Sequence, residues 1–189
     1  LGELEASLPE GVTVNVFYDR GQLVDRAVST VMEALLEATV LVVVLLVLFL
    51  GDARAALTVS VVLPLSALIT FILMRQFGLS ANLMSLGGLA IAIGMLVDAS
   101  IVVVENTTTW LKREKTSGLP RLHLIYRAAS EVAVPVTAGI GIIIIVFLPL
   151  LSLQGLEGKL FSPVALTMVF ALTGSLVLAL TLMPVLASW

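Results

Sequence analysis

Residues 82–106 read NLMSLGGLAIAIGMLVDASIVVVEN. This stretch is long and apolar enough to cross a bilayer as one helix, yet Asp98 lies near its middle and Glu105 lies toward its end. A carboxylate at bilayer depth is costly, so such a residue is a functional candidate by default. We therefore predict a transmembrane helix that carries an ionisable site.

The polar and small residues of this predicted helix share one face. At about 100° per residue, five of them fall within roughly 40° of a single line along the helix: Met84, Gly87, Gly94, Asp98 and Glu105. Small residues allow a neighbouring helix to approach closely. We interpret this face as a packed interface with an ionisable centre, and not as a surface that contacts lipid.

The composition excludes a soluble globular chain, because 59% of the residues are hydrophobic and only 12% are charged. Long apolar runs recur too often for a signal peptide to explain them. Disulfides and thiolate metal sites are excluded, since the chain has no cysteine. The sequence starts at Leu1 without a start methionine, and we expect it to be a piece of a larger protein.

These patterns predict an all-α membrane protein, a bundle of five transmembrane spans preceded by a small α/β remnant of an outside domain in residues 1–20. The expected spans are 38–50, 55–74 with a kink at Pro64, 82–106, 132–153 and 161–186. Three of them fall in residues 21–107, and two in residues 132–189. Residues 108–131 combine five basic residues with an apolar side, and we expect an amphipathic helix on the membrane surface.

Charges in the short loops predict the orientation of the bundle. The 108–131 segment and Arg54 put most of the basic residues on one side of the membrane, against Arg75 and Lys159 on the other. The positive-inside rule then places residues 108–131 in the cytoplasm and residues 1–25 outside.

Three separated motifs carry a resemblance to a known family. The motif GMLVDASIVVVEN (94–106) resembles the fourth transmembrane helix of resistance-nodulation-division transporters. The stretches VFYDRGQLVDRAV (16–28) and LPLLSLQGLEGKLFSPVALT (148–167) resemble the heavy-metal efflux branch. Ala99 follows Asp98 where the drug-efflux branch usually has a second aspartate, which argues against that branch.

The resemblance covers nearly the whole chain and implies a proton-driven metal exporter, which is not an enzyme. The five spans would match the second to sixth of twelve. The full-length protein would be a homotrimer in the inner membrane of a Gram-negative bacterium, joined to a periplasmic adaptor and an outer-membrane channel. Asp98 would relay protons, with Glu105 as a second acid, and the cation that pairs with Asp98 would come from another helix. We expect Asp98 to be mostly protonated in this chain alone. No cofactor and no nucleic-acid partner are expected.

Methionines are the only soft ligands that the chain offers, and thioethers favour Cu(I) or Ag(I) over harder divalent ions. By the resemblance, Met84 matches a position on the metal path of copper/silver pumps, Met95 lies one residue from another, and Met168 lies one turn before a third. Ala92 stands where zinc/cobalt pumps usually have a further acid. We therefore favour copper or silver, with divalent-metal efflux as the alternative. For each methionine, the competing interpretation is apolar filler.

Other functions remain open at this point. An intramembrane aspartyl protease needs two facing aspartates, and only Asp98 lies within a predicted span. A passive cation channel could also use an acid-lined helix face, but it would not require Asp98 to change protonation. A lipid or protein exporter would share the relay helix without the motifs at 16–28 and 148–167.

Overall fold

The computed structural model describes residues 20–50, 53–112 and 120–187, and all regular elements in this part are helical. The elements are α2 (Arg20–Leu50), α3 (Ala53–Ser60), α4 (Val62–Gln76), α5 (Leu83–Leu96), α6 (Asp98–Lys112), α8 (Arg121–Phe147), the 3-10 helix η1 (Leu148–Ser152) and α9 (Gly155–Leu186). The predicted helical bundle is therefore confirmed for the described part. The α/β remnant predicted for residues 1–20 falls almost entirely on residues 1–19, which lie outside the described residues.

Five described stretches are long and apolar enough to cross a membrane, as the apolar runs predicted. They are Gly21–Leu45, Ala56–Gln76, Leu83–Lys112, Arg121–Ser152 and Gly155–Leu186. The first stretch begins well before the predicted residue 38, because α2 continues unbroken through its polar first turns. Large apolar side chains remain exposed on α2 and α8, where the surrounding lipid would cover them.

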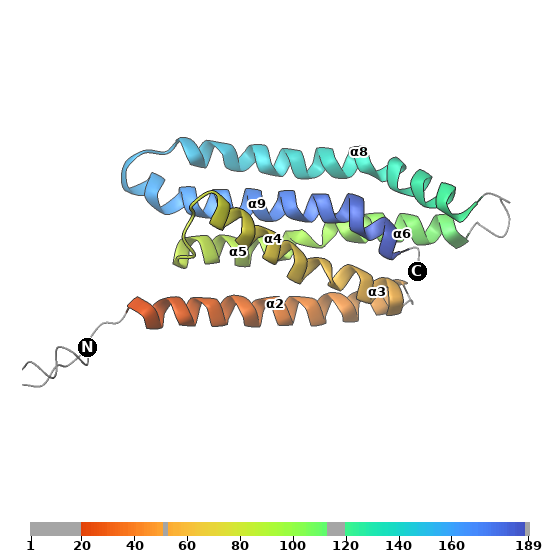
Figure 1. Cartoon of the computed structure of the whole chain (residues 1–189), viewed down its shortest axis with the longest axis horizontal. Coiled ribbons are helices and arrows are strands. Elements are labelled where there is room, and N and C mark those ends of the chain that lie inside the picture. Colours follow the sequence, from red (N-terminus) through yellow and green to blue (C-terminus); the bar gives the residue numbers. More distant parts are fainter. Residues whose placement is uncertain (1–19, 51–52, 113–119, 188–189) are drawn as a thin grey trace, which may run out of the picture.

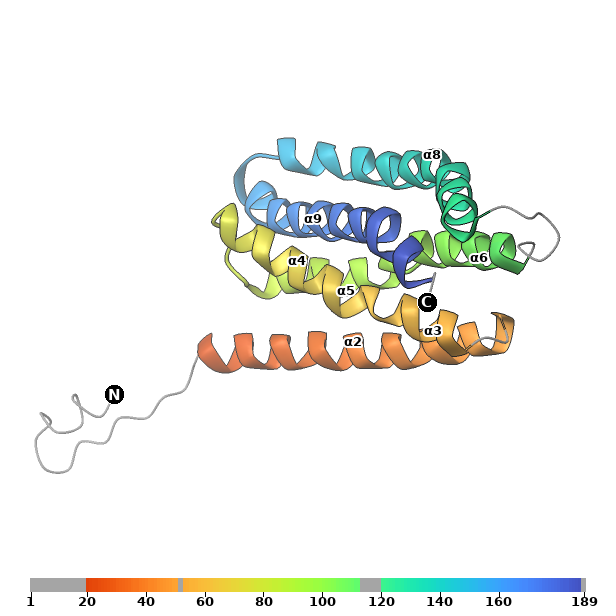
Figure 2. The same cartoon turned by 45° about the vertical axis from the view of Figure 1, so that its right-hand side comes forward.

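Helix α9 lies at the centre of the bundle and contacts α4, α5, α6 and α8 (Figures 1 and 2). It can approach several neighbours because many of its buried residues are small: Ala165, Ala171, Gly174, Ser175 and Ala179. Helix α8 lies along one side of α9, while α2 lies on the other side of the bundle against α3 and α5 (Figure 1). The segment that carries Asp98 is therefore held mainly by α9, with α2 near its first half and α8 near its second half.

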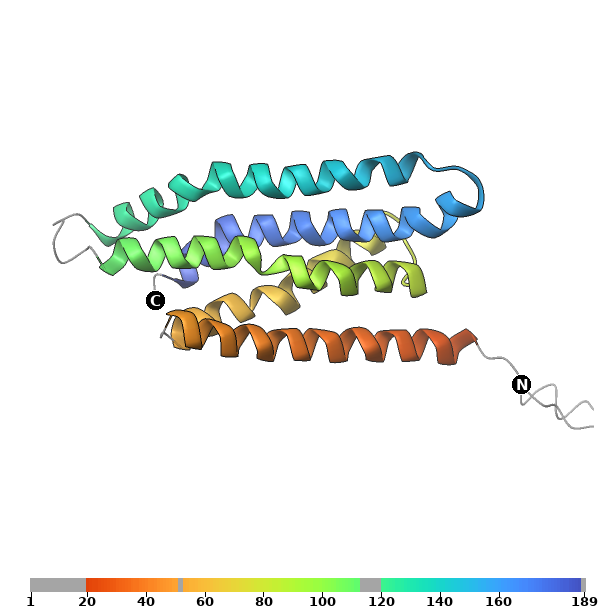
Figure 3. The same ribbon diagram turned by 180° about the vertical axis from the view of Figure 1, so that it is seen from behind.

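Prolines mark two irregularities of the bundle. The second span is divided at Val61 into α3 and α4, three residues before Pro64, as the predicted kink requires. Pro135 lies inside α8, where its ring nitrogen cannot donate the backbone hydrogen bond of a regular helix. The first turns of α8 lean toward the end of α6 in Figures 2 and 3.

Two further boundaries differ from the sequence-based expectation. The predicted surface segment 108–131 is divided between the last turn of α6, which ends at Lys112, and the start of α8 at Arg121, while residues 113–119 lie outside the described residues. Helix α9 begins at Gly155 and not near residue 161, because Gly155 adopts a positive φ of 74° that turns the chain directly into the helix.

Candidate functional site

The helix that carries the candidate site begins at a well-formed cap. The Asn82 side chain accepts hydrogen bonds from the backbone N–H groups of Met84 (3.0 Å) and Ser85 (2.9 Å). The Ser85 hydroxyl accepts a bond from the Asn82 N–H in return, at 2.9 Å. This capping box satisfies N–H groups that would otherwise lack partners, and it defines where α5 starts.

The predicted single helix 82–106 is interrupted next to its aspartate. Helix α5 ends at Leu96, α6 begins at Asp98, and Val97 joins them (Figure 3). The Ser175 hydroxyl on α9 donates a hydrogen bond to the Leu96 carbonyl at this junction. Asp98 is therefore the first residue of a new helix and not a residue in the middle of a regular one, which the sequence analysis did not predict.

Exposure follows the face that the spacing defined. Leu86, Leu89, Leu96 and Val103 are at most 2% exposed and pack into the core. On the opposite face the side chains are exposed, and they are the same residues that the sequence placed on one line: Met84, Gly87, Gly94, Asp98 and Glu105. We call these five residues the relay face. The described part of the chain does not cover it, so the packed interface expected there stays a prediction.

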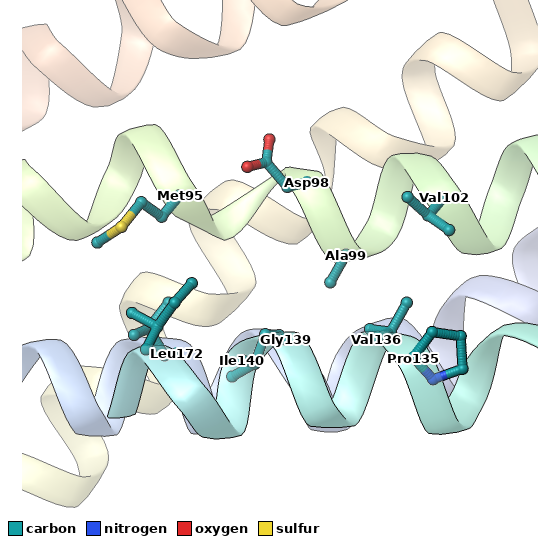
Figure 4. Close-up of a pocket in the computed structure, with 10 residues that line it drawn as sticks. Met95, Asp98, Ala99, Val102, Pro135, Val136, Gly139, Ile140 and Leu172 are labelled. Atoms are coloured by element: carbon teal, nitrogen blue, oxygen red, sulfur yellow. The ribbon is translucent and has the colours of Figure 1, made fainter. Parts of the chain in front are cut away.

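A cavity of about 320 Å³ lies beside Asp98, between the α5–α6 junction and α8 (Figure 4). Its walls are almost entirely apolar: Met95, Ala99, Val102, Pro135, Val136, Gly139, Ile140, Ile143 and Leu172 line it together with Asp98. Ala99 points toward α8, whereas the Asp98 carboxylate points away from it (Figure 4). Asp98 therefore lies at the rim of this cavity, with its carboxyl group directed away from α8.

No lysine or arginine that the structure describes is placed to pair with Asp98. Each lies within about two turns of a helix end, such as Arg75 in the last turn of α4 and Lys112 at the end of α6. Asp98, in contrast, lies in the middle of the stretch Leu83–Lys112. A counter-ion for its ionised form must therefore come from outside the described residues.

Glu105 lies on α6, on the same face as Asp98 and two turns further along. The helical rise between them is about 10 Å, which is too long for a direct hydrogen bond. Water or another side chain would have to carry a proton between these two acids.

The structure does not gather the three candidate methionines into one site. Met84 lies in the first turn of α5 and is 40% exposed, while Met95 lies in its last turn and lines the cavity beside Asp98. About 16 Å of helical rise separates these two residues. Met168 is only 2% exposed within the core. In the described part of the chain, no group of three or more histidine, cysteine, aspartate or glutamate side chains could hold a metal ion.

A polar contact between α6 and α8 was not predicted from the sequence. The Glu131 carboxylate accepts hydrogen bonds from Trp110 Nε1 (2.8 Å) and Asn106 Nδ2 (3.1 Å), and Asn106 also donates to the Ala128 carbonyl at 2.8 Å. The Arg127 guanidinium lies 5.8 Å from the centre of the Trp110 ring. Asn106 and Trp110 are one turn apart, and this spacing was a signal that both side chains share a face.

Comparisons with known proteins agree with the motifs. The family model described as the AcrB/AcrD/AcrF family matches residues 1–189. The chain is 43% identical over 190 residues to the cobalt-zinc-cadmium resistance protein CzcA of Cupriavidus metallidurans, and 41% identical over 196 residues to the cation efflux system protein CusA of Escherichia coli K12. These matches cover 97% and 100% of this chain.

The chain spans only 18% of the length of the first of these relatives and 19% of the second. It also resembles a solved structure described as a heavy metal efflux pump, with a TM-score of 0.76 and 43% identity over 95% of this chain and 17% of that one. The match to the family model extends over every residue. The chain therefore belongs to the AcrB/AcrD/AcrF family, the resistance-nodulation-division transporters that its motifs resemble.

Proposed function

We propose that the full-length gene product exports heavy-metal cations across the inner membrane in exchange for protons, and that Asp98 is the proton-relay carboxylate. The observation that carries this proposal is the position of Asp98. It lies at mid-span, at a helix break, on a face that the described chain leaves uncovered and without a cation of its own. An ionisable group at such a position is expensive to keep without a function.

The proposed mechanism follows from the two protonation states that the Asp98 carboxyl can adopt in this environment. A neutral Asp98 can remain at bilayer depth without a partner, whereas the ionised form needs a cation within a few ångströms. A helix that brings a basic side chain to the relay face and removes it again would drive proton release and uptake. Glu105 extends this path toward the cytoplasmic end of α6, with water spanning the gap between the two acids.

For the exported metal we propose Cu(I) or Ag(I). Met84 and Met95 are the accessible soft ligands on the helix of the relay carboxylate, and Met95 lines the cavity beside it. Met168 would join the path only if the core around it opened. Divalent cations are the second candidate, because the identity to a cobalt-zinc-cadmium resistance protein, 43%, is similar to the 41% shared with the cation efflux protein CusA.

The further assembly that we propose is a homotrimer joined to a periplasmic adaptor and an outer-membrane channel. In this arrangement residues 1–25 face the periplasm and residues 108–131 face the cytoplasm. The basic residues Lys112, Arg121 and Arg127 at the facing ends of α6 and α8 support this orientation.

Metal resistance tests the proposal directly. A pump-deleted bacterium receives the full-length gene, with Asp98 intact or as Asp98→Asn, which keeps the size and polarity of the side chain but cannot release a proton. Protection against copper or silver by the parent alone is the expected result. Protection against zinc or cobalt would contradict the methionine argument and keep the relay. Equal protection by the variant would exclude Asp98 as the coupling residue and favour a passive channel.

A further inference from the structure

The junction between α5 and α6 contains two buried serines on neighbouring helices. Ser100 in the first turn of α6 is 0% exposed, and Ser175 on α9 is 1% exposed. The Ser175 hydroxyl donates to the Leu96 carbonyl, at the last residue of α5. A side chain that inserts into the backbone hydrogen-bond ladder is a recognised cause of helix kinks. Ser175 is therefore placed to hold the interruption at Val97.

The Ser100 hydroxyl has no hydrogen-bond partner among the described residues. Buried serines and threonines elsewhere in this chain donate to the carbonyl four residues earlier: Ser66 to Val62, Thr70 to Ser66 and Thr107 to Val103. The equivalent acceptor for Ser100 is the Leu96 carbonyl, which already accepts from Ser175. A buried hydroxyl without a partner costs free energy, so an alternative state in which Ser100 takes this carbonyl is favoured by its own hydrogen bond.

We propose that Ser175 is a positioning residue for the relay helix, and that Ser100 competes with it for the Leu96 carbonyl. In the state described here, the bond from Ser175 ties α9 to the junction just before Asp98. In the alternative state the bond from Ser100 stays within the α5–α6 segment, and α9 is released. The role of Asp98 in this inference rests on the proposed function, whereas the exchange of hydrogen bonds does not.

The exchange of hydrogen bonds between Ser175 and Ser100 would reach Asp98 over a short distance along the chain. Leu96 and Ser100 are each two residues from Asp98, so a change in the junction between them changes the direction of its side chain. Leu172, one turn before Ser175 on α9, lines the cavity at whose rim Asp98 lies. Movement of α9 relative to the junction would therefore alter the cavity and the aspartate together.

A double-mutant cycle tests the competition in the full-length protein in lipid nanodiscs. The variants are Ser175→Ala, Ser100→Ala and the two combined, and the readout is hydrogen–deuterium exchange of the backbone amides around residues 96–101, measured by mass spectrometry. Ser66→Ala is the matched control, because Ser66 is equally buried and its hydroxyl donates only to carbonyls of its own helix, those of Val62 and Leu63.

We expect Ser100→Ala alone to leave the hydrogen–deuterium exchange of these amides unchanged, because the Ser100 hydroxyl has no partner to lose. Ser175→Ala alone has a limited effect, since Ser100 then takes the free carbonyl. In the double variant no hydroxyl remains for this carbonyl, and exchange rises by about tenfold beyond the product of the single effects. Additive effects would overturn the competition. Amide exchange in the double variant equal to that of Ser66→Ala would overturn the positioning role.

Transport measured as a function of pH separates positioning from packing. We expect Ser175→Ala to shift the pH profile of metal transport and Ser66→Ala to leave it in place. An unchanged profile in Ser175→Ala would overturn the link to Asp98. Failure of the proposed function would appear separately, as transport that survives Asp98→Asn, and would leave the amide-exchange result intact.

Discussion

Replacing Gly88 with alanine tests the closest approach between α5 and the central helix α9. A Cβ at Gly88 would lie 2.8 Å from the Val164 carbonyl oxygen, 3.1 Å from its Cα and 3.3 Å from its carbonyl carbon. All three are backbone atoms, so no side-chain rotation can relieve the contact. The oxygen would have to move to at least 3.4 Å, the start of ordinary van der Waals contact, and the two helices would have to separate.

Over-packing of this kind costs about 1–3 kcal/mol. The matched control is Gly141→Ala on α8, where an added Cβ would meet nothing within 4 Å. Both substitutions gain helix propensity by the same mechanism, so the difference between the variants isolates the contact with Val164. We therefore expect Gly88→Ala to be less stable than Gly141→Ala by about 1–3 kcal/mol.

The assay is unfolding of the full-length protein in mixed micelles by titration with sodium dodecyl sulfate, monitored by tryptophan fluorescence. A lower midpoint for Gly88→Ala and an unchanged or higher midpoint for Gly141→Ala would agree with the close approach. A difference between the two variants below about 0.5 kcal/mol, the usual range for substitutions away from any special feature, would refute it.

Three further predictions concern the relay face and its surroundings. Gly94→Leu should abolish transport, because nothing in the described part of this chain lies within 4 Å of a Cβ there and the larger side chain would displace an additional helix packed on the relay face of the full-length protein; full transport would instead indicate a lipid-facing surface. Trp110→Phe keeps an aromatic ring but removes the donor to Glu131, and it should cost about 0.5–1.5 kcal/mol in the same titration followed by circular dichroism, which does not depend on the replaced tryptophan; no change would show that the contact contributes nothing. Met84→Leu and Met95→Leu conserve side-chain volume, and such substitutions usually cost less than about 1.5 kcal/mol of stability, so they should leave expression intact. They should reduce copper resistance, because each removes a thioether. Undiminished resistance would exclude these thioethers from the metal path.

The helical class and the five spans followed from the sequence because their cause is local. A long apolar run must satisfy its own backbone hydrogen bonds in lipid, and only a helix does this within one segment. The division of the second span was also predictable, since Pro64 cannot donate a backbone hydrogen bond. The early start of α9 was not, because it depends on a positive φ at Gly155 that no apolar pattern encodes.

Which residues share a helix face with Asp98 was predictable from the sequence, whereas the local geometry around Asp98 was not. Regular spacing identified the residues of the relay face, and the structure leaves that side of α5 and α6 exposed while the other side is buried. The junction at Val97 was invisible, because its cause lies far away in the sequence: the Ser175 hydroxyl reaches the Leu96 carbonyl from α9. The contact of Glu131 with Asn106 and Trp110 likewise depends on how α8 lies against α6.

The break and the uncovered face together support the proposal that Asp98 relays protons. A carboxylate in a continuous helix can change its surroundings only if the whole helix moves, whereas the first residue after a junction can turn while the rest of the helix stays packed. Burial of the opposite side of α5 and α6 holds both helices in place against α9, which leaves the junction as the point of adjustment. A small change in the backbone at this junction can thus bring Asp98 toward a cation on the relay face or move it away. Ser100 and Ser175 lie at the junction and are placed to control that change.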